Sequence, residues 1–172
     1  AAGHRGETMV EGFQVYLQRQ LRPNLQSLLD LVTSGKVDAV LATAASADYA
    51  AGLGERLGFQ HVLATPAHRN SDDTPNRGPH KRHRVLEFLE GRNWTSRPLI
   101  LVTDHIDDLP LMRESQLVCW FGSPKHIGAA RAAAGNAQFI YCRDLSDEGV
   151  LVTLLSSSAS ESRPSVNRGI DA

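Results

Sequence analysis

Three acidic residues follow a short apolar run near the middle of the chain, in the stretch PLILVTDHIDDLPLM that spans residues 98 to 112. The run is too short for a helix and ends at Thr103, so it predicts a buried strand that leads into a loop of carboxylates. In an open α/β sheet, ligands bind just beyond the carboxyl ends of the strands. Asp104, Asp107 and Asp108 are therefore candidate ligands for a hard cation such as Mg²⁺.

Other polar side chains follow the remaining predicted strands. Thr43 and Thr65 each stand at the end of an apolar run, a further loop follows Phe121, and Lys81 lies at the start of a predicted helix. A phosphate ester bound with Mg²⁺ needs carboxylates for the metal, and hydroxyl, amide and ammonium donors for its oxygens. Because the strand ends of a parallel sheet share one edge, these residues together with Asp104 predict such a site.

The elements that would position these residues alternate along the chain. Mostly apolar runs of five or six residues predict strands at 37–42, 61–65, 99–103, 116–121 and 138–142. Helical periodicity and capping residues predict helices at 7–20, 23–31, 47–57, 80–91, 108–113 and 124–134. This alternation is typical of a parallel sheet with helices on both faces. We expect a helical segment at 1–22, a core at 23–155 and a disordered tail at 156–172, which has little to bury.

Composition narrows the class of protein. The 172 residues suit a single domain, and 18 basic against 19 acidic side chains give a net charge of -1, so neither nucleic acid nor an anionic membrane is expected as a partner. Cys119 and Cys142 lie in apolar runs, which favours buried free thiols and a cytoplasmic location. No run is long enough to span a membrane. His80 and His83 are the only two histidines close together in the sequence. No cysteine lies near them, which disfavours a zinc site.

The order of LATAAS, LAT, GPHKRHRVLEFL and LVTDHIDDLPLM resembles the haloacid dehalogenase (HAD)-like hydrolase superfamily, and most closely its phosphoserine-phosphatase-like branch. The resemblance covers about residues 23 to 142. It implies a Rossmannoid three-layer α/β sandwich with a mostly parallel sheet. It also implies a Mg²⁺-dependent phosphatase that hydrolyses a small phosphorylated metabolite through an aspartyl-phosphate.

The resemblance assigns roles to four residues. Thr43 resembles the hydroxyl that binds the phosphoryl group, Lys81 the lysine that neutralises its charge, and Asp104 the direct Mg²⁺ ligand. Asp108 resembles the second acid, which supports the metal through water or steadies Lys81. The family commonly has Asn where this chain has Asp107.

Each role has a simpler alternative. Asp104 could be a solvated helix cap, Asp108 the N-cap of the helix at 108–113, and Thr43 an ordinary β-branched strand residue. Lys81 belongs to the charged run at 81–84, and such runs are usually solvated.

One part of the family pattern was not found in this sequence. The nucleophile of the family lies in a DxDx(T/V) motif after the central strand, which would pair between the strands that end at Thr43 and Asp104. We expect either an N-terminally incomplete chain, since the sequence opens on Ala1, or a degenerate homologue that binds phosphate or acts as a scaffold without catalysis. Without that strand two sheet edges stay unpaired, which would favour self-association. A receiver domain is disfavoured because Lys81 precedes the acids.

Overall fold

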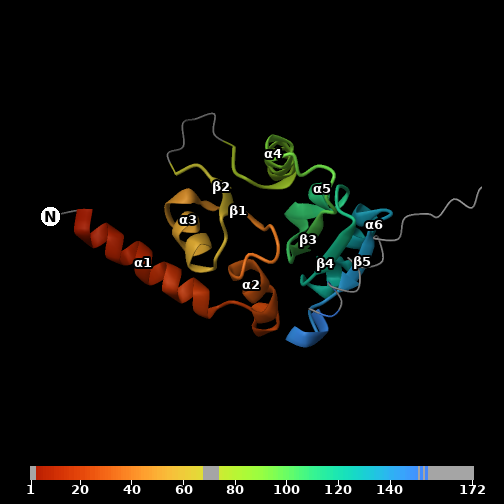
Figure 1. The fold of residues 1–172 in the computed structure, drawn as a ribbon, viewed down its shortest axis with the longest axis horizontal. Helices are drawn as coiled ribbons and strands as arrows, with labels where there is room; N and C mark the ends of the chain where they lie inside the picture. Colours follow the sequence, from red (N-terminus) through yellow and green to blue (C-terminus); the bar gives the residue numbers. More distant parts are fainter. Residues whose placement is uncertain (1–2, 68–73, 151, 153, 155–172) are drawn as a thin grey trace, which may run out of the picture.

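The structure, a computed structural model, describes residues 3–67, 74–150, 152 and 154, and it alternates strands and helices as the sequence predicts (Figure 1). The described strands are β1 (Val40–Ser46), β2 (His61–Thr65), β3 (Ile100–Thr103), β4 (Leu117–Trp120) and β5 (Gln138–Tyr141). The α-helices are α1 (Gly3–Arg19), α2 (Gln26–Thr33), α3 (Ala47–Arg56), α4 (Gly78–Gly91), α5 (Leu109–Met112) and α6 (Ile127–Ala134). Short 3-10 helices are η1 (Pro23–Leu25), η2 (Ile106–Asp108) and η3 (Pro124–His126).

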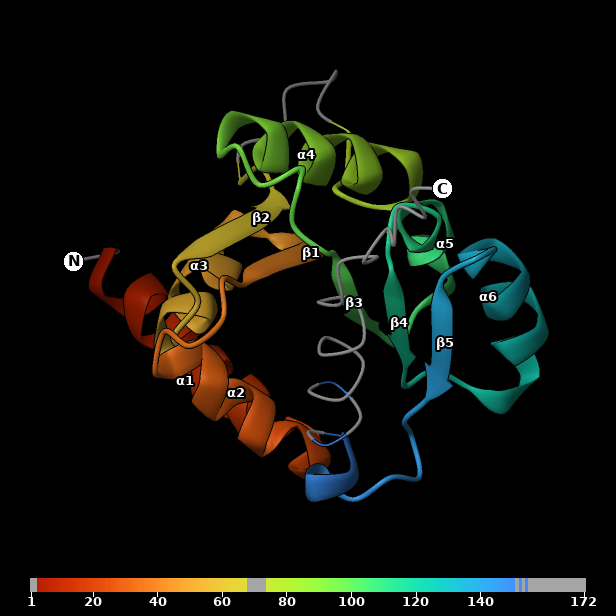
Figure 2. The same cartoon turned by 45° about the vertical axis from the view of Figure 1, so that its right-hand side comes forward.

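All described strand pairs are parallel, which confirms the α/β class. The strands form two sheets, β1-β2 and β3-β4-β5, and β1 and β3 belong to different sheets. Figure 2 shows β1 and β3 as the inner strands of the two sheets. The division therefore falls at the position where the family resemblance places a further strand.

Helices cover both faces of each sheet. On the three-stranded sheet, Val118 and Trp120 of β4 pack with Met112 of α5 and the alanines of α6. On the opposite face, Cys119 and the adjacent Phe121 pack against residues that include Leu28 of α2. The two-stranded sheet contacts both α3 and α4. These contacts give the three layers expected of the fold.

The helix α1 differs from the amphipathic helix predicted at 7–20. Its exposed apolar side chains are Met9, Phe13 and Tyr16, which periodicity had placed on one apolar face. Against α3 the helix instead buries Gln14, whose amide donates to the Tyr49 carbonyl. A polar side chain is tolerated in this contact because it finds hydrogen-bond partners there.

The two cysteines are free and buried, as the sequence predicts. Cys119 has a strongly raised pKa, because its thiol hydrogen-bonds to Cys142 and is buried. The same hydrogen bond lowers the pKa of Cys142. Cys119 lies in β4 and Cys142 directly follows β5, and both pack in the same buried apolar cluster.

Element boundaries shift by a few residues at several places. β2 matches its prediction, whereas β1 starts at Val40 instead of residue 37 and continues to Ser46, with a register shift between Ala42 and Ser46. Thr43 therefore lies inside the strand. The predicted tail at 156–172 falls outside the described residues. Among the helices that the structure describes, none has the combined length and apolar character needed to cross a membrane.

Candidate functional site

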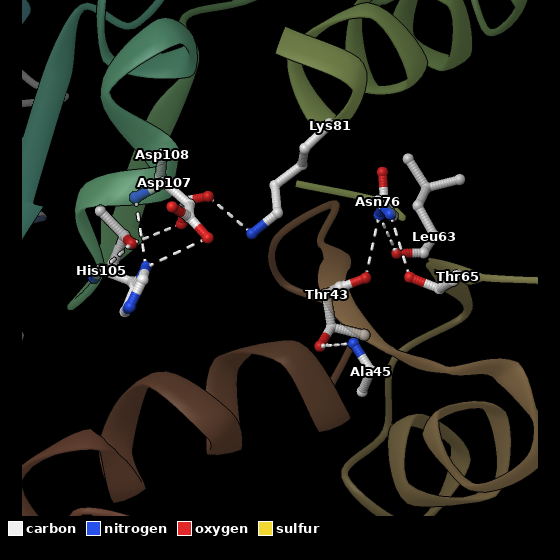
Figure 3. Close-up of polar contacts among 10 residues, drawn as sticks. Thr43, Ala45, Leu63, Thr65, Asn76, Lys81, His105, Asp107 and Asp108 are labelled. Carbon is white, nitrogen blue, oxygen red and sulfur yellow. Dashed lines mark hydrogen bonds and ion pairs between the residues drawn. The ribbon is translucent and has the colours of Figure 1, made fainter. Parts of the chain in front are cut away.

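A buried ion pair joins the first turn of α4 to the loop after β3 (Figure 3). Lys81 Nζ lies 2.6 Å from Asp108 Oδ1, at an angle that does not meet that of a regular hydrogen bond. Thr103 Oγ1 donates to Asp108 Oδ2 over 2.6 Å. All three residues are less than 9% exposed. Lys81 is therefore not part of a solvated charged face, and both carboxylate oxygens of Asp108 are occupied.

The loop between β3 and α5 is folded so that Asp108 comes back beneath the end of the strand. The backbone amide of His105 donates to Thr103 Oγ1, and His105 Nδ1 caps the start of η2 by accepting from the backbone amide of Asp107. Asp108 precedes α5 but makes no capping hydrogen bond with its side chain. Its carboxylate is directed at Lys81, which corresponds to the steadying role that the resemblance offered as one of two possibilities.

Asp104 lies in the same loop in a different environment. Its side chain is 59% exposed and forms an ion pair with Arg22, whose Nη2 lies 3.2 Å from Asp104 Oδ2. Asp107 Oδ2 lies 3.6 Å from His105 Nδ1. Within the described residues, no group of three or more His, Cys, Asp or Glu side chains is placed to hold a metal ion. Asp104 is thus the acid of this loop most open to an added cation.

The loop after β4 packs directly on the backbone of Asp104. A Cβ atom added at Gly122 would overlap the Asp104 carbonyl oxygen and the Trp120 ring. Only glycine allows the two loops to approach so closely. The loop after Phe121, which the sequence placed at the site, therefore packs against the backbone of Asp104.

Asn76 ties β1 and β2 to the start of α4. This fully buried residue donates through Nδ2 to the carbonyls of Thr43, at 3.0 Å, and Leu63, at 2.6 Å. Its backbone amide donates to Thr65 Oγ1, which in turn donates to the Ala44 carbonyl. The Thr65 hydroxyl is 1% exposed and occupied by these bonds, so the prediction that it faces a ligand is wrong.

Thr43 lies on the other side of Lys81 from the acidic loop (Figure 3). Its carbonyl is held by Asn76, five residues before Lys81, so the middle of β1 and the Lys81–Asp108 ion pair lie on either side of the start of α4. Its hydroxyl accepts from the Ala45 amide at 3.1 Å. Among the described contacts, no hydrogen bond joins the Thr43 hydroxyl to Lys81 or Asp104. The structure thus places Thr43 near the acid pair without direct contact.

Three residues of this arrangement were missed from the sequence. Thr103 carried a signal, since a hydroxyl at a strand end before an acidic loop is placed to hydrogen-bond an acid of that loop. Asn76 lies in a polar stretch where asparagine is ordinary. Arg22 is 82 positions from Asp104, and no local pattern links two residues so far apart.

Comparison with known proteins bears on this site. Residues 2–113 match the family described as haloacid dehalogenase-like hydrolase, which is 112 of the 172 residues. The matched range begins before the segment that the motifs indicated and ends before β4. It contains Thr43, Lys81, Asp104 and Asp108. No curated protein and no solved structure matches the chain.

Removing only one charge of the Lys81–Asp108 pair should destabilise the folded protein. Asp108→Leu leaves an uncompensated buried ammonium, and we expect it to lower the free energy of unfolding by about 3–5 kcal/mol. The double variant Lys81→Met/Asp108→Leu removes both charges and should be more stable than Asp108→Leu. Urea unfolding followed by circular dichroism measures both. Equal stability of the single and double variants would contradict the buried pair.

Asn76 should contribute strongly to the stability of the protein, because its one buried side chain serves two backbone carbonyls. Asn76→Ala leaves the Thr43 and Leu63 carbonyls without their buried donor, so we expect a loss of about 2–4 kcal/mol in the free energy of unfolding. Asn136→Ala, at an exposed position, is the matched control and should change it by less than about 0.5 kcal/mol. If both variants unfold at the same urea concentration, Asn76 does not fasten the strands.

Proposed function

Because this chain belongs to the haloacid dehalogenase-like hydrolase family, we propose that it is the phosphate-binding part of a Mg²⁺-dependent phosphatase that acts on small phosphorylated metabolites. The observation that carries the proposal is the buried Lys81–Asp108 pair beside the exposed carboxylate of Asp104. A pair held this way fixes an ammonium at a strand end, where it neutralises phosphoryl oxygens without having to reorganise.

Each side chain has a role in this proposal. Lys81 keeps ammonium donors for the phosphoryl oxygens beyond the one directed at Asp108. Asp108, oriented by Thr103, holds the ammonium in place. Thr43 adds its hydroxyl from β1, since that hydroxyl accepts from the Ala45 amide and keeps its own O–H to donate to a phosphoryl oxygen.

The charge around the site favours a divalent cation. Arg22 and Lys81 carry two positive charges, and Asp104, Asp107 and Asp108 carry three negative charges, which leaves a net charge of -1 on these five side chains. A phosphate dianion would be repelled by this balance. A bound Mg²⁺ would reverse the sign and neutralise the phosphoryl oxygens. Asp104 fits as one ligand, since Mg²⁺ is commonly held by one or two carboxylates with waters and phosphate.

The attacking carboxylate must come from elsewhere. Asp108 is committed to Lys81, and Asp104 is reserved for the metal, so neither acid is free to attack phosphorus. We propose that a strand seated between β1 and β3 supplies it. The nucleophilic aspartate would attack phosphorus, the alcohol would leave after protonation by the next acid of the same motif, and water would hydrolyse the aspartyl-phosphate.

Burial supports a strand at this position. The four residues of β4, which has a partner on each side, are 0–4% exposed. Each residue of β1 is at least partly exposed, and Ile100 at the start of β3 is 36% exposed, although both strands are apolar. An inserted strand would pair both edges and cover these side chains. It would need to be parallel and apolar on both faces.

The alternative is a homologue that binds phosphate without hydrolysing it. It is favoured by one observation, namely that Asp104 and Asp108, the two acids of the described site that match the family pattern, are both paired with basic side chains. The two functions make opposite predictions for turnover, so one assay separates them.

The coding sequence upstream of Ala1 should encode a short apolar run that ends in DxDx(T/V). The natural gene product should hydrolyse p-nitrophenyl phosphate with Mg²⁺, and Asp104→Asn should lower kcat/KM by at least about 100-fold. Glu90→Gln, on the exposed face of α4, is the control and should keep full activity. Saturable phosphate binding without hydrolysis would support the alternative function. If the Asp104→Asn variant hydrolyses the substrate as fast as the unmodified protein, this site is not where hydrolysis occurs.

Arg22 should compete with a cation for Asp104. Removing its charge with Arg22→Gln should tighten Mn²⁺ binding, used in place of Mg²⁺, by about two- to fivefold, because the ion pair is partly exposed and screened. Electron paramagnetic resonance of free Mn²⁺ measures the affinity. Arg19→Gln changes the net charge equally without the contact and should leave the affinity within about 1.5-fold. Equal effects of the two variants would show that Arg22 does not compete.

A further inference from the structure

Both ends of α5 are tied to the first turn of α4. Before α5, Asp108 pairs with Lys81. After α5, Glu114 pairs with Arg82, whose Nε and Nη2 lie 2.8 Å and 2.6 Å from Glu114 Oε1. Two consecutive residues of α4 thus hold two acids that lie on either side of one short helix.

This double attachment matters because the sheet does not fix the distance between the two halves. The described strands β1 and β3 are not paired, so Lys81 reaches Asp108 from a helix that follows the other sheet. On the far side, the halves are joined by contacts of η1 and α2 with residues after β5, such as Ser27 with Asp147. On the α4 side, the described ion pairs between the halves are those of Lys81 and Arg82.

The geometry of a helix makes the second pair useful to the first. Consecutive side chains on a helix leave it about 100° apart, so two pairs restrain both the position and the rotation of α4, whereas one pair restrains only its distance. Arginine adds direction, because its planar group presents donors in a fixed arrangement. In the described contacts, neither Arg82 nor Glu114 bonds to Asp104 or Thr43.

We propose that Arg82, through Glu114, is a positioning residue that sets the Lys81 ammonium at the distance from Asp104 and Thr43 that phosphate requires. The proposal rests on the phosphate site proposed above. It assigns to Arg82 a larger role in ligand affinity than in stability. The Arg82 side chain is 42% exposed and the Glu114 side chain is 30% exposed. Exposed pairs of this kind contribute little to stability.

The test is an orthophosphate titration with Mg²⁺, followed by amide chemical shifts in the whole protein. Arg82→Gln and Glu114→Gln should each weaken phosphate binding by about three- to thirtyfold. Their melting temperatures should fall by less than about 3 °C. The charge-swapped variant Arg82→Glu/Glu114→Arg rebuilds the pair and should recover most of the lost affinity.

Matched controls remove the same charges nearby. Arg113→Gln and Glu90→Gln are at exposed positions and should stay within about twofold of the unmodified protein. If the Arg82 and Glu114 variants bind phosphate as the controls do, or lose thermal stability without losing affinity, the positioning role is overturned.

The double variant Lys81→Met/Asp108→Leu, which removes the ammonium without leaving a buried charge unpaired, separates this role from the proposed function. If the folded double variant does not bind phosphate and Glu114→Gln has no effect, the phosphate site stands and Arg82 has no part in it. If the unmodified protein shows no saturable binding, or if the double variant binds as tightly as the unmodified protein, both proposals fail.

Discussion

The arrangement of this protein depends on a buried ammonium and the carboxylate that compensates it. Lys81 and Asp108 are each 7% exposed, and neither charge would be stable at that depth without the other. The pair links α4, which follows the two-stranded sheet, to the loop that follows the first strand of the three-stranded sheet. A contact needed to satisfy two charges therefore also sets how the halves of the molecule meet.

Polar side chains add further links between the halves, beside the apolar packing of Leu25 and Leu28 on the three-stranded sheet. Asn76 fixes the start of α4 to β1 and β2, and Arg82 holds the segment after α5. Arg22 reaches Asp104 across 82 positions of sequence. Such contacts are directional but individually modest, in contrast to the continuous hydrogen bonding of a sheet. A strand added between β1 and β3 would thus replace separate contacts with continuous hydrogen bonding between the two halves.

The acids of the loop after β3 illustrate how environment separates roles that sequence alone leaves equal. Asp104 and Asp108 lie four residues apart in one motif. The turn of η2 buries Asp108 under Thr103 and Lys81, while Asp104 remains exposed beside Arg22. The same side chain is a fixed counter-ion at one position and an exposed carboxylate at the other. This difference is the basis for our proposal that Asp104 holds the metal while Asp108 holds Lys81.

The sequence by itself determined the α/β class, the order of the strands and helices, and the buried thiols, because these follow from local periodicity and from apolar runs. The order of the motifs also pointed to Lys81 and the acidic loop, but through the resemblance to a family, because Lys81 taken alone belongs to a charged run of the kind that is usually solvated. Only the tertiary structure decided that Thr65 is a structural hydroxyl, that Asn76 and Arg22 belong to the site, and that α1 buries Gln14 while Phe13 is exposed. These outcomes depend on partners tens of residues away, and the chain brings such partners together only when it folds.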